Sequence, residues 1–400
     1  MAKKKNKELS KSTINLGASL HESNPEIAQE RYELSIRKGE VPAMFNLAEM
    51  IKEKEPEEAI RLYRMAIDKE HVDAMFNLAI LLKEKEPEEA IKLYRMAINK
   101  GHIDAMYNLA NLLKEKEPEE AIKLYRMAIK KGHVAAMYNL AIMLKEKEPE
   151  EAIKLYRMAI DKGYVGAMFN LAVMLKEKQP EEAIKLYHMA INKGHVAAMF
   201  NLANFIKKKQ PEEAIKLYRM AIDKGHVNAI INLAIMLKDK QPEETIKLFR
   251  MAVDKGHVNS MNNLAIMLQE KQPEEAIKLY RMAIDMGHLY AGYNLALMLK
   301  DKQPEEAIKL FRTAIDRGDI SATFNLAIML QEKQPEEAIK LFYMAIDKGH
   351  VNAMNNLAIL LEEKQPDEAI RLYRMAIDRG HVKAAFNLSI MLKKSKPNKP

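Results

Sequence analysis

The sequence contains no cysteine, so a disulfide-stapled secreted protein is not a model for it. The first residues, MAKKKNKELSKS, include lysines but no apolar stretch, and they do not predict a secretory signal peptide. No apolar run approaches the roughly 18 residues that a membrane-spanning helix needs. From these absences we expect a cytoplasmic protein without a membrane span.

Motifs of the common catalytic sites are also missing. The sequence has no P-loop, no dinucleotide-binding glycine motif, no HExxH and no nucleophile elbow. Paired glutamates such as Glu88 and Glu89 recur along the chain at expected helix starts. Acid–base catalysis would instead need carboxyl groups in one cleft with pKa values set apart. We therefore expect no enzymatic activity, no catalytic residue and no cofactor.

The net charge of +8 is concentrated at the two ends of the chain. Residues 1–12 hold five lysines against one glutamate, and residues 391–400 hold four lysines without an acidic residue. The sequence between them is close to neutral and has no basic stripe of the kind that follows a phosphate backbone. Residues 1–12 and 395–400 are predicted to be disordered basic tails, which can contact nucleic acid or anionic lipid or act only as solubilising ends.

The dominant feature of the sequence is an internal repeat. The stretch 72–102, VDAMFNLAILLKEKEPEEAIKLYRMAINKGH, is 31 residues long and recurs along almost the whole chain. A fixed period in this range indicates a repeat architecture. The proline of the unit marks the register at Pro25, Pro56, Pro87, Pro118, Pro149, Pro180, Pro211, Pro242, Pro273, Pro304, Pro335, Pro366 and Pro397.

Each unit is predicted to form two helices. Apolar residues from Ala74 to Leu82 have the spacing of an amphipathic helix, and a second such stripe follows from Ala90 to Ile98. Pro87 is expected in the first turn of the second helix, and Gly101 just past its last turn. One helix pair cannot bury two apolar stripes alone, so neighbouring units must stack.

These residues resemble a known family. Met75-x2-Leu78-Ala79-x2-Leu82, followed by Ala90-x3-Tyr94, is similar to the tetratricopeptide pattern. The run Gly101-His102-x2-Ala105, followed by Tyr107-Asn108-Leu109, resembles the Sel1-like branch. The unit is shorter than either family's usual repeat, and it lacks the glycine-valine loop typical of Sel1-like repeats.

The resemblance covers roughly residues 12–394 and implies an all-α fold. We expect an α-solenoid, a right-handed superhelix, of about twelve 31-residue helix–turn–helix repeats over residues 13–394, forming one elongated domain. Ser10 or Ser12 is expected to cap the first helix of the array, and Asn24 the second. The last helix, about 382–394, carries Ser389 in place of a small apolar residue and is predicted to be a C-terminal cap.

Histidine recurs at one position after the glycine of the second helix. Equivalent residues of neighbouring units should lie about 8–10 Å apart or more, because that is the spacing of packed helices, so they cannot share a zinc ion. We expect no metal site, and we expect each histidine to bond to the carbonyl groups at the helix end. The column comprises His71, His102, His133, His195, His226, His257, His288, His350 and His381.

An asparagine precedes the core leucine of each first helix, where it interrupts an apolar stripe. The resemblance implies that the first helices line a concave surface and that this column is similar to an asparagine ladder that holds extended peptides. The alternative is that each asparagine bonds to the backbone of a neighbouring repeat. The column comprises Asn46, Asn77, Asn108, Asn139, Asn170, Asn201, Asn232, Asn263, Asn294, Asn325, Asn356 and Asn387. The aromatic residues before them, expected to contact the same peptide, are Phe45, Phe76, Tyr107, Tyr138, Phe169, Phe200, Tyr293, Phe324 and Phe386.

Two other patterns have alternative interpretations. The methionines at Met75, Met106 and Met137 could form a soft groove, but their position favours ordinary core packing. Departures from the common unit are either a partner's footprint or neutral drift. They are Asn111, Asn204, Asn262, Asn355 and the stretch 286–323 with Tyr290, Gly292, Thr313 and Asp319.

The sequence thus predicts a non-enzymatic scaffold or adaptor that binds an extended segment of a protein or peptide in its concave groove. Nucleic acid is not the expected partner of the array. The alternative is a spacer whose lysine-rich tails contact nucleic acid or anionic membrane.

Overall fold

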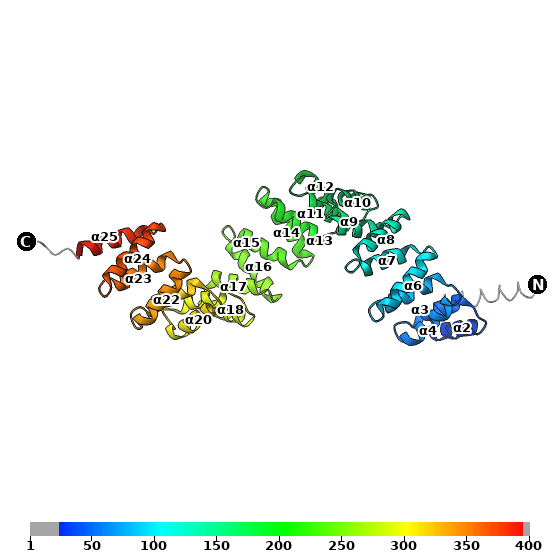
Figure 1. Ribbon diagram of the computed structural model, residues 1–400, viewed down its shortest axis with the longest axis horizontal. Helices are drawn as coiled ribbons and strands as arrows, with labels where there is room; N and C mark the ends of the chain where they lie inside the picture. Colours follow the sequence, from blue (N-terminus) through cyan, green and yellow to red (C-terminus); the bar gives the residue numbers. More distant parts are fainter. Residues whose placement is uncertain (1–23, 395–400) are drawn as a thin grey trace, which may run out of the picture. The chain divides into compact units, whose positions relative to one another are not determined.

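The computed structural model describes residues 24–394, which contain 24 α-helices and, within that range, no β-strand. The predicted tails 1–12 and 395–400, the first helix of the array and the caps at Ser10 and Ser12 lie outside the described residues. Each regular repeat consists of a shorter first helix and a longer second helix, which confirms the predicted all-α solenoid (Figure 1).

The odd-numbered helices are the first helices of the repeats. They are α3 (Val41–Ile51), α5 (Val72–Leu82), α7 (Ile103–Leu113), α9 (Val134–Leu144), α11 (Val165–Leu175), α13 (Val196–Ile206), α15 (Val227–Leu237), α17 (Val258–Leu268), α19 (Ala291–Leu299), α21 (Ile320–Leu330), α23 (Val351–Leu361) and α25 (Val382–Lys394).

The even-numbered helices are the second helices. They are α2 (Pro25–Arg37), α4 (Pro56–Ile67), α6 (Pro87–Asn99), α8 (Pro118–Lys130), α10 (Pro149–Asp161), α12 (Pro180–Asn192), α14 (Pro211–Asp223), α16 (Pro242–Asp254), α18 (Pro273–Asp285), α20 (Pro304–Asp316), α22 (Pro335–Asp347) and α24 (Pro366–Asp378).

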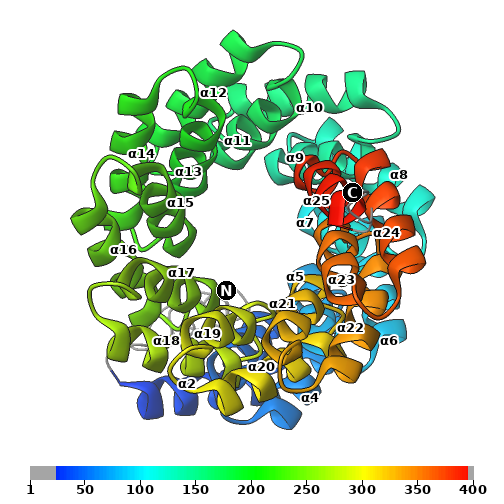
Figure 2. The same ribbon diagram turned by 90° about the vertical axis from the view of Figure 1, so that its left-hand side faces the viewer.

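The chain divides into two compact units, residues 1–198 and residues 199–400. We call them the N-terminal unit and the C-terminal unit. The division falls inside α13, in a regular repeat, and not at a linker. The single elongated domain therefore stays a prediction. In each unit taken by itself, the odd-numbered helices lie on the inner side of the curve and the even-numbered helices on the outer side (Figure 2).

The core is formed by the same few positions in each repeat. In the repeat 72–102, Ala74, Leu78 and Ala79 of α5 and Ala97 of α6 are fully buried, and Tyr94 is 1% exposed. The alanines allow the two helix backbones to approach, and the tyrosine ring fills the space that remains. Met75, at 3% exposed, packs in this core as predicted.

The turn after each second helix is a Schellman motif that also begins the next helix. After α6, the Gly101 N–H donates to the Ile98 carbonyl at 2.8 Å and the His102 N–H donates to the Ala97 carbonyl at 3.0 Å. This turn requires a left-handed residue, and Gly101 has φ of +89°. Glu70 takes the same place after α4 with φ of +61°.

Proline begins each second helix, as the sequence predicts. Pro87 occupies the first turn of α6, where its missing N–H costs no hydrogen bond, and Glu88 and Glu89 follow in that turn. Asn24, the expected cap of α2, makes no side-chain capping hydrogen bond.

The closing helix α25 packs mainly against α24, and also against α23. Ser389 lies on its exposed side and donates to the Phe386 carbonyl at 2.8 Å. The same side keeps apolar surface, because Val382 is 87% exposed and Phe386 is 67% exposed.

Candidate peptide-binding face

The structure places the whole asparagine column on the first helices, and every member from Asn46 to Asn387 is half-buried. Nine of the asparagines follow an aromatic residue, which is also half-buried except for Phe386 on α25, which is exposed. Because the first helices lie on the inner side of each unit, the predicted site residues share one face within each unit (Figure 2).

Many of these asparagines donate a hydrogen bond to a side chain of the preceding repeat. Asn139 Nδ2 donates to Asn111 Oδ1 at 2.9 Å and to Tyr107 Oη at 3.1 Å. The partner lies 28 or 32 residues earlier in the chain. The other pairs are Asn77–Glu49, Asn170–Tyr138, Asn232–Asn204, Asn294–Asn262, Asn325–Tyr293 and Asn387–Asn355. The structural alternative expected backbone partners, and this detail is wrong because the acceptors between repeats are side chains.

Four of the departures from the common unit have a structural role in these pairs. Asn111, Asn204, Asn262 and Asn355 each accept the amide of the next repeat. The sequence interpretation treated them as a footprint or as drift, and neither explanation is needed. The signal that could have found them was the second asparagine 28 or 32 residues later.

Some of these acceptors also receive a buried tyrosine hydroxyl. Tyr125 Oη donates to Asn111 Oδ1 at 2.6 Å, and Tyr218 Oη donates to Asn204 Oδ1 at 2.8 Å. Burial raises the pKa of both tyrosines to about 12. The hydroxyl is therefore a neutral donor at physiological pH.

Glu49 has the same role in its repeat. It accepts hydrogen bonds from Tyr63 and Asn77. Burial opposes its charged form, but the bonds from Tyr63, Lys52 and Asn77 together lower the pKa of Glu49. Glu49 is therefore a charged acceptor in the polar contact between these two repeats.

Other asparagines of the column have no such partner among the described residues. Asn108 faces a preceding repeat that offers only Phe76 and Ile80 at the two acceptor positions, and Asn263 faces Ile231 and Ile235. No hydrogen bond to the Asn108 or Asn263 amide is found within residues 24–394. An unpaired amide offers two N–H donors and one carbonyl acceptor.

The aromatic residues of the face are partly covered by the histidine that begins the next first helix. The Phe76 ring stacks on His102 with centroids 4.3 Å apart and lies 6.1 Å from the Tyr94 ring. The same stacking joins Phe45–His71, Tyr107–His133, Phe169–His195, Phe200–His226 and Phe324–His350. One side of each ring is thereby fixed, and the rest of the ring is half-open to solvent.

The histidine column begins helices and does not end them. His102 Nδ1 accepts the Ala105 N–H at 3.1 Å, which makes His102 the N-cap of α7. His71, His133, His195, His257 and His381 make the same contact, and Asp319 replaces histidine in this role at 3.0 Å. The expected bond to a helix-terminal carbonyl is made by the backbone N–H of His102, whereas its side chain caps the next helix. Within residues 24–394, no group of three or more histidines, aspartates or glutamates could hold a metal ion.

The divergent stretch after Asp285 interrupts the inner face of the C-terminal unit. Helix α19 has 9 residues where most other first helices have 11, and Leu289 and Tyr290 precede it as a turn. His288 Nδ1 accepts the Tyr290 N–H, two residues on, at 3.2 Å. Gly292 replaces the usual methionine, and glycine weakens a helix turn.

This interruption exposes apolar side chains beside a pocket. Met286, Leu289 and Tyr290 are 52%, 51% and 56% exposed. A pocket of about 530 Å³ is lined by these three residues, by the start of α17 and by His288. Asn263, one of the unpaired members of the column, belongs to its wall.

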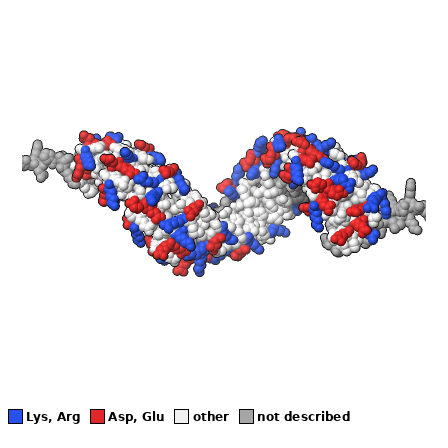
Figure 3. Space-filling view, turned by 90° about the horizontal axis from the view of Figure 1, so that it is seen from below, with Lys and Arg blue, Asp and Glu red and all other residues white. Residues whose placement is uncertain are grey.

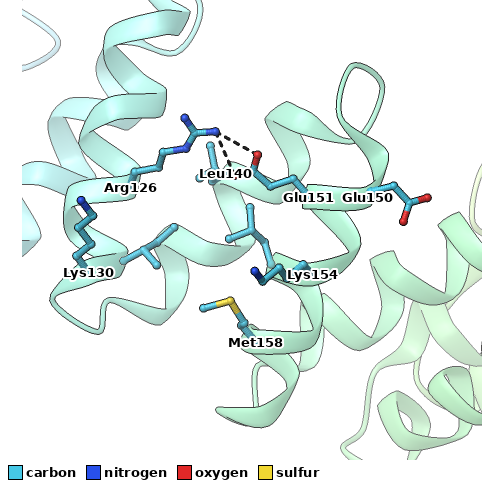
Figure 4. Close-up of a pocket in the computed structure, with 9 residues that line it drawn as sticks. Arg126, Lys130, Leu140, Glu150, Glu151, Lys154 and Met158 are labelled. Carbon is cyan, nitrogen blue, oxygen red and sulfur yellow. Dashed lines mark hydrogen bonds and ion pairs between the residues drawn. The ribbon is translucent and has the colours of Figure 1, made fainter.

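The outer side of the molecule offers grooves of a different kind. A pocket of about 580 Å³ lies between α8 and α10, with Leu140, Leu155 and Met158 among its lining residues (Figure 4). Arg126 donates to Glu151 at 3.1 Å at its edge. Similar grooves in other repeats have Arg64 and Arg250 among their lining residues. Equivalent residues of different repeats line these grooves, so none of them stands out as a specific binding site.

Charge separates the two sides. Asp, Glu, Lys and Arg mix over much of the surface in Figure 3, which also shows a stretch that is almost free of them. The first helices from α9 to α23 contain no Asp, Glu, Lys or Arg. The exceptions nearer the N-terminus are Glu49 of α3, Asp73 of α5 and Asp104 of α7, and the last two have 62% and 63% side-chain exposure. No helix within residues 24–394 is both long and apolar enough to cross a membrane.

Comparison with known proteins agrees with this architecture. A search of curated proteins found no match to the sequence. A protective antigen of uropathogenic Escherichia coli with an SLR fold aligns over 92% of this chain and 91% of its own, with 19% identity and a TM-score of 0.59. A Sel1 repeat protein from Oxalobacter formigenes aligns over 52% of this chain and 96% of its own, with 22% identity and a TM-score of 0.42. Identities at this level indicate the fold alone.

Family models match the repeats directly. The tetratricopeptide repeat model matches residues 51–105 and 107–167. The Sel1 repeat model matches residues 165–195, 196–226, 232–257, 258–288, 291–319, 320–350 and 351–381. These Sel1 matches span more than half of the sequence, and the chain belongs to the Sel1 repeat family.

Proposed function

We propose that this protein is a non-enzymatic scaffold that binds an extended segment of a partner protein along the inner face of its first helices. Tetratricopeptide and Sel1 repeats generally mediate protein–protein interaction, and solenoids present extended binding surfaces. The observation that carries the proposal is the column of half-buried asparagines beside half-open aromatic rings, with unpaired amides at Asn108 and Asn263.

The chemistry of the column suits a peptide backbone. An amide side chain can accept a backbone N–H and donate to a backbone carbonyl at once. An asparagine that is bonded to the preceding repeat, such as Asn139, still keeps a carbonyl oxygen and a second N–H. The aromatic rings supply apolar contact beside these amides.

The test compares unpaired and paired asparagines. Partner proteins captured from native lysate with the wild type are identified, and their affinity is measured for an Asn108→Ala/Asn263→Ala variant and for Asn139→Ala. We expect the double variant to lose binding and to remain as helical by circular dichroism, because the two amides make no side-chain hydrogen bond within residues 24–394. Asn139→Ala is expected to lose stability as well, because it leaves Asn111 without its amide donor.

The Asn108→Ala/Asn263→Ala variant could instead keep its helicity and bind every captured partner with unchanged affinity. The inner face would then not be the binding surface. A cytoplasmic location stays a prediction of the sequence.

The alternative function rests on the charge at the ends of the chain, where residues 1–12 and 391–400 account for the net +8. If these tails contact nucleic acid or anionic lipid, binding falls steeply with salt and disappears when residues 1–12 and 391–400 are deleted. Binding that survives the deletion and depends on Asn108 and Asn263 favours the scaffold.

A further inference from the structure

We infer that the C-terminal unit selects an uncharged partner segment and that the pocket beside α19 binds one apolar side chain of that segment. This inference rests on the proposed function and adds the chemistry of the partner.

The first step concerns the inner helices of this unit. Helices α15, α17, α19, α21 and α23 contain no Asp, Glu, Lys or Arg, and the charged residues of the first helices in this unit are the lysines of the closing helix α25. A charged side chain laid along them would lose water without gaining a counter-charge, and such a loss is costly. A segment of neutral polar and apolar residues avoids this cost.

The second step is a comparison of one position within the chain. The second residue of the first helix is Asp73 in α5 and Asp104 in α7, whereas in α15, α17 and α23 of the C-terminal unit it is Asn228, Asn259 and Asn352. In the same unit it is Ser321 in α21 and Lys383 in the closing helix α25. All of these side chains are exposed. The fold therefore accepts a carboxylate at this position, and packing does not require the neutral amide.

These amides add to the main column. Asn259 lies one helical turn before Asn263, and both belong to the wall of the pocket beside α19. Together they present donors and acceptors at two successive levels of α17. An extended backbone that follows this face has hydrogen-bonding groups of both kinds to meet.

The third step is the pocket. Its other wall consists of Met286, Leu289 and Tyr290, each more than half exposed. A volume of about 530 Å³ is more than one side chain needs, and the pocket has no charged residue in its lining. Apolar side chains left this exposed gain free energy when another apolar group covers them. An apolar residue of the bound segment would therefore be held next to the Asn259 and Asn263 amides.

The experiment uses a displayed library of random 16-residue peptides selected against the full chain. We expect the selected sequences to be poor in Asp, Glu, Lys and Arg and to share an apolar residue. One selected peptide is then synthesised, and its affinity for wild type and variants is measured by fluorescence anisotropy.

Two variants test the apolar wall and the neutral amide separately, and a third serves as the control. Leu289→Ala/Tyr290→Ala should weaken the peptide about tenfold or more, since it removes the apolar wall. Asn259→Asp should weaken a neutral peptide several-fold and favour peptides that carry Lys or Arg. The control, Asp104→Asn, changes charge at the same repeat position in the N-terminal unit and should leave binding unchanged.

The outcomes separate the two proposals. If no peptide is enriched on the wild type, the array does not hold extended peptides and the proposed function fails, together with this inference. If the enriched peptides are rich in charge, the inference is overturned and the proposed function stands. If a neutral peptide binds the Leu289→Ala/Tyr290→Ala variant as tightly as the wild type, the pocket has no part in binding.

Discussion

The repeat 72–102 and the repeat 289–319 have the same length and similar outer helices, apart from Phe311 and Thr313, but different inner sides. In the first, α5 begins at once after the His71 cap, and Met75 fills the core. In the second, α19 begins late, Gly292 leaves the methionine position empty, and Leu289 and Tyr290 are exposed. The comparison teaches that stacking fixes the alanine, leucine and aromatic positions, whereas the start of a first helix is free to vary.

The largest effect is expected from breaking the first helix in either repeat. Ala79→Pro in α5 and Ala296→Pro in α19 each remove a helix hydrogen bond at a fully buried residue and should cost about 3 kcal/mol or more. Because each repeat contacts mainly its neighbours, the loss of amide protection from hydrogen exchange should stay within the compact unit that carries the change. Loss of protection over the whole chain in one step would contradict nearest-neighbour stacking.

Two glycines should respond with opposite signs. Gly101 has φ of +89°, so Gly101→Ala should destabilise the protein by about 1 kcal/mol. Gly292 lies in the first turn of a helix, and a Cβ there meets no atom within 4 Å, so Gly292→Ala should stabilise by about 0.5–1 kcal/mol. Denaturant unfolding measures both. A destabilised Gly292→Ala variant would mean that the late start of α19 needs glycine.

Histidines before the first helices should make the stability of both kinds of repeat sensitive to acid. Burial lowers the pKa of His195 and of His288. A histidine whose pKa is lower in the folded state contributes stability that is present above its unfolded pKa, about 6.5, and that is lost as pH falls towards the folded value. The melting temperature should therefore fall between pH 7.5 and pH 5. His195→Asp keeps an acceptor like Asp319 and should reduce this fall, and an identical fall in the variant would exclude His195 as a cause.

The smallest effect is expected on the outer side, where the two repeats agree. Arg95 donates to Glu120 at 3.0 Å and Arg312 donates to Glu337 at 2.9 Å, with both arginines about half exposed. Exposed pairs of this kind contribute roughly 0.2–1 kcal/mol. Arg95→Ala and Arg312→Ala should therefore lower stability equally and slightly, and less so in high salt. A clear difference between them would show that the outer sides are not equivalent.

The sequence was sufficient for the architecture, because the determinants of a repeat are local. Pro87, the Ala90 to Ile98 stripe and Gly101 begin, bury and end one helix, and each recurs at a fixed period. The buried methionine at Met75 followed from the same periodicity.

The sequence was less informative where the answer depended on a neighbour's side chain. The pairing of Asn139 with Asn111 joins residues of two repeats, and helical periodicity within one repeat does not encode it. The histidine was assigned to the end of one helix because glycine precedes it, whereas in the turn its Nδ1 faces the N–H groups of the next helix. The stretch around α19 diverges visibly in sequence. The exposure of Leu289 and Tyr290, however, depends on how the turn before α19 packs, which the repeat pattern does not encode.

The asparagine pairs between repeats bear on how a chain of near-copies folds. Since the units are almost interchangeable, a nascent chain can stack a unit on the wrong copy of its neighbour with nearly the same burial of apolar surface. Asn139 would then meet Ile80 in place of Asn111, and a half-buried amide would lose its acceptor. Asn77–Glu49, Asn232–Asn204 and Asn294–Asn262 distinguish other neighbours in the same way. We expect Asn111→Ile/Asn204→Ile to refold with more misassembled product than the wild type. The irregular asparagines stabilise stacking on the correct neighbouring repeat and not on another copy.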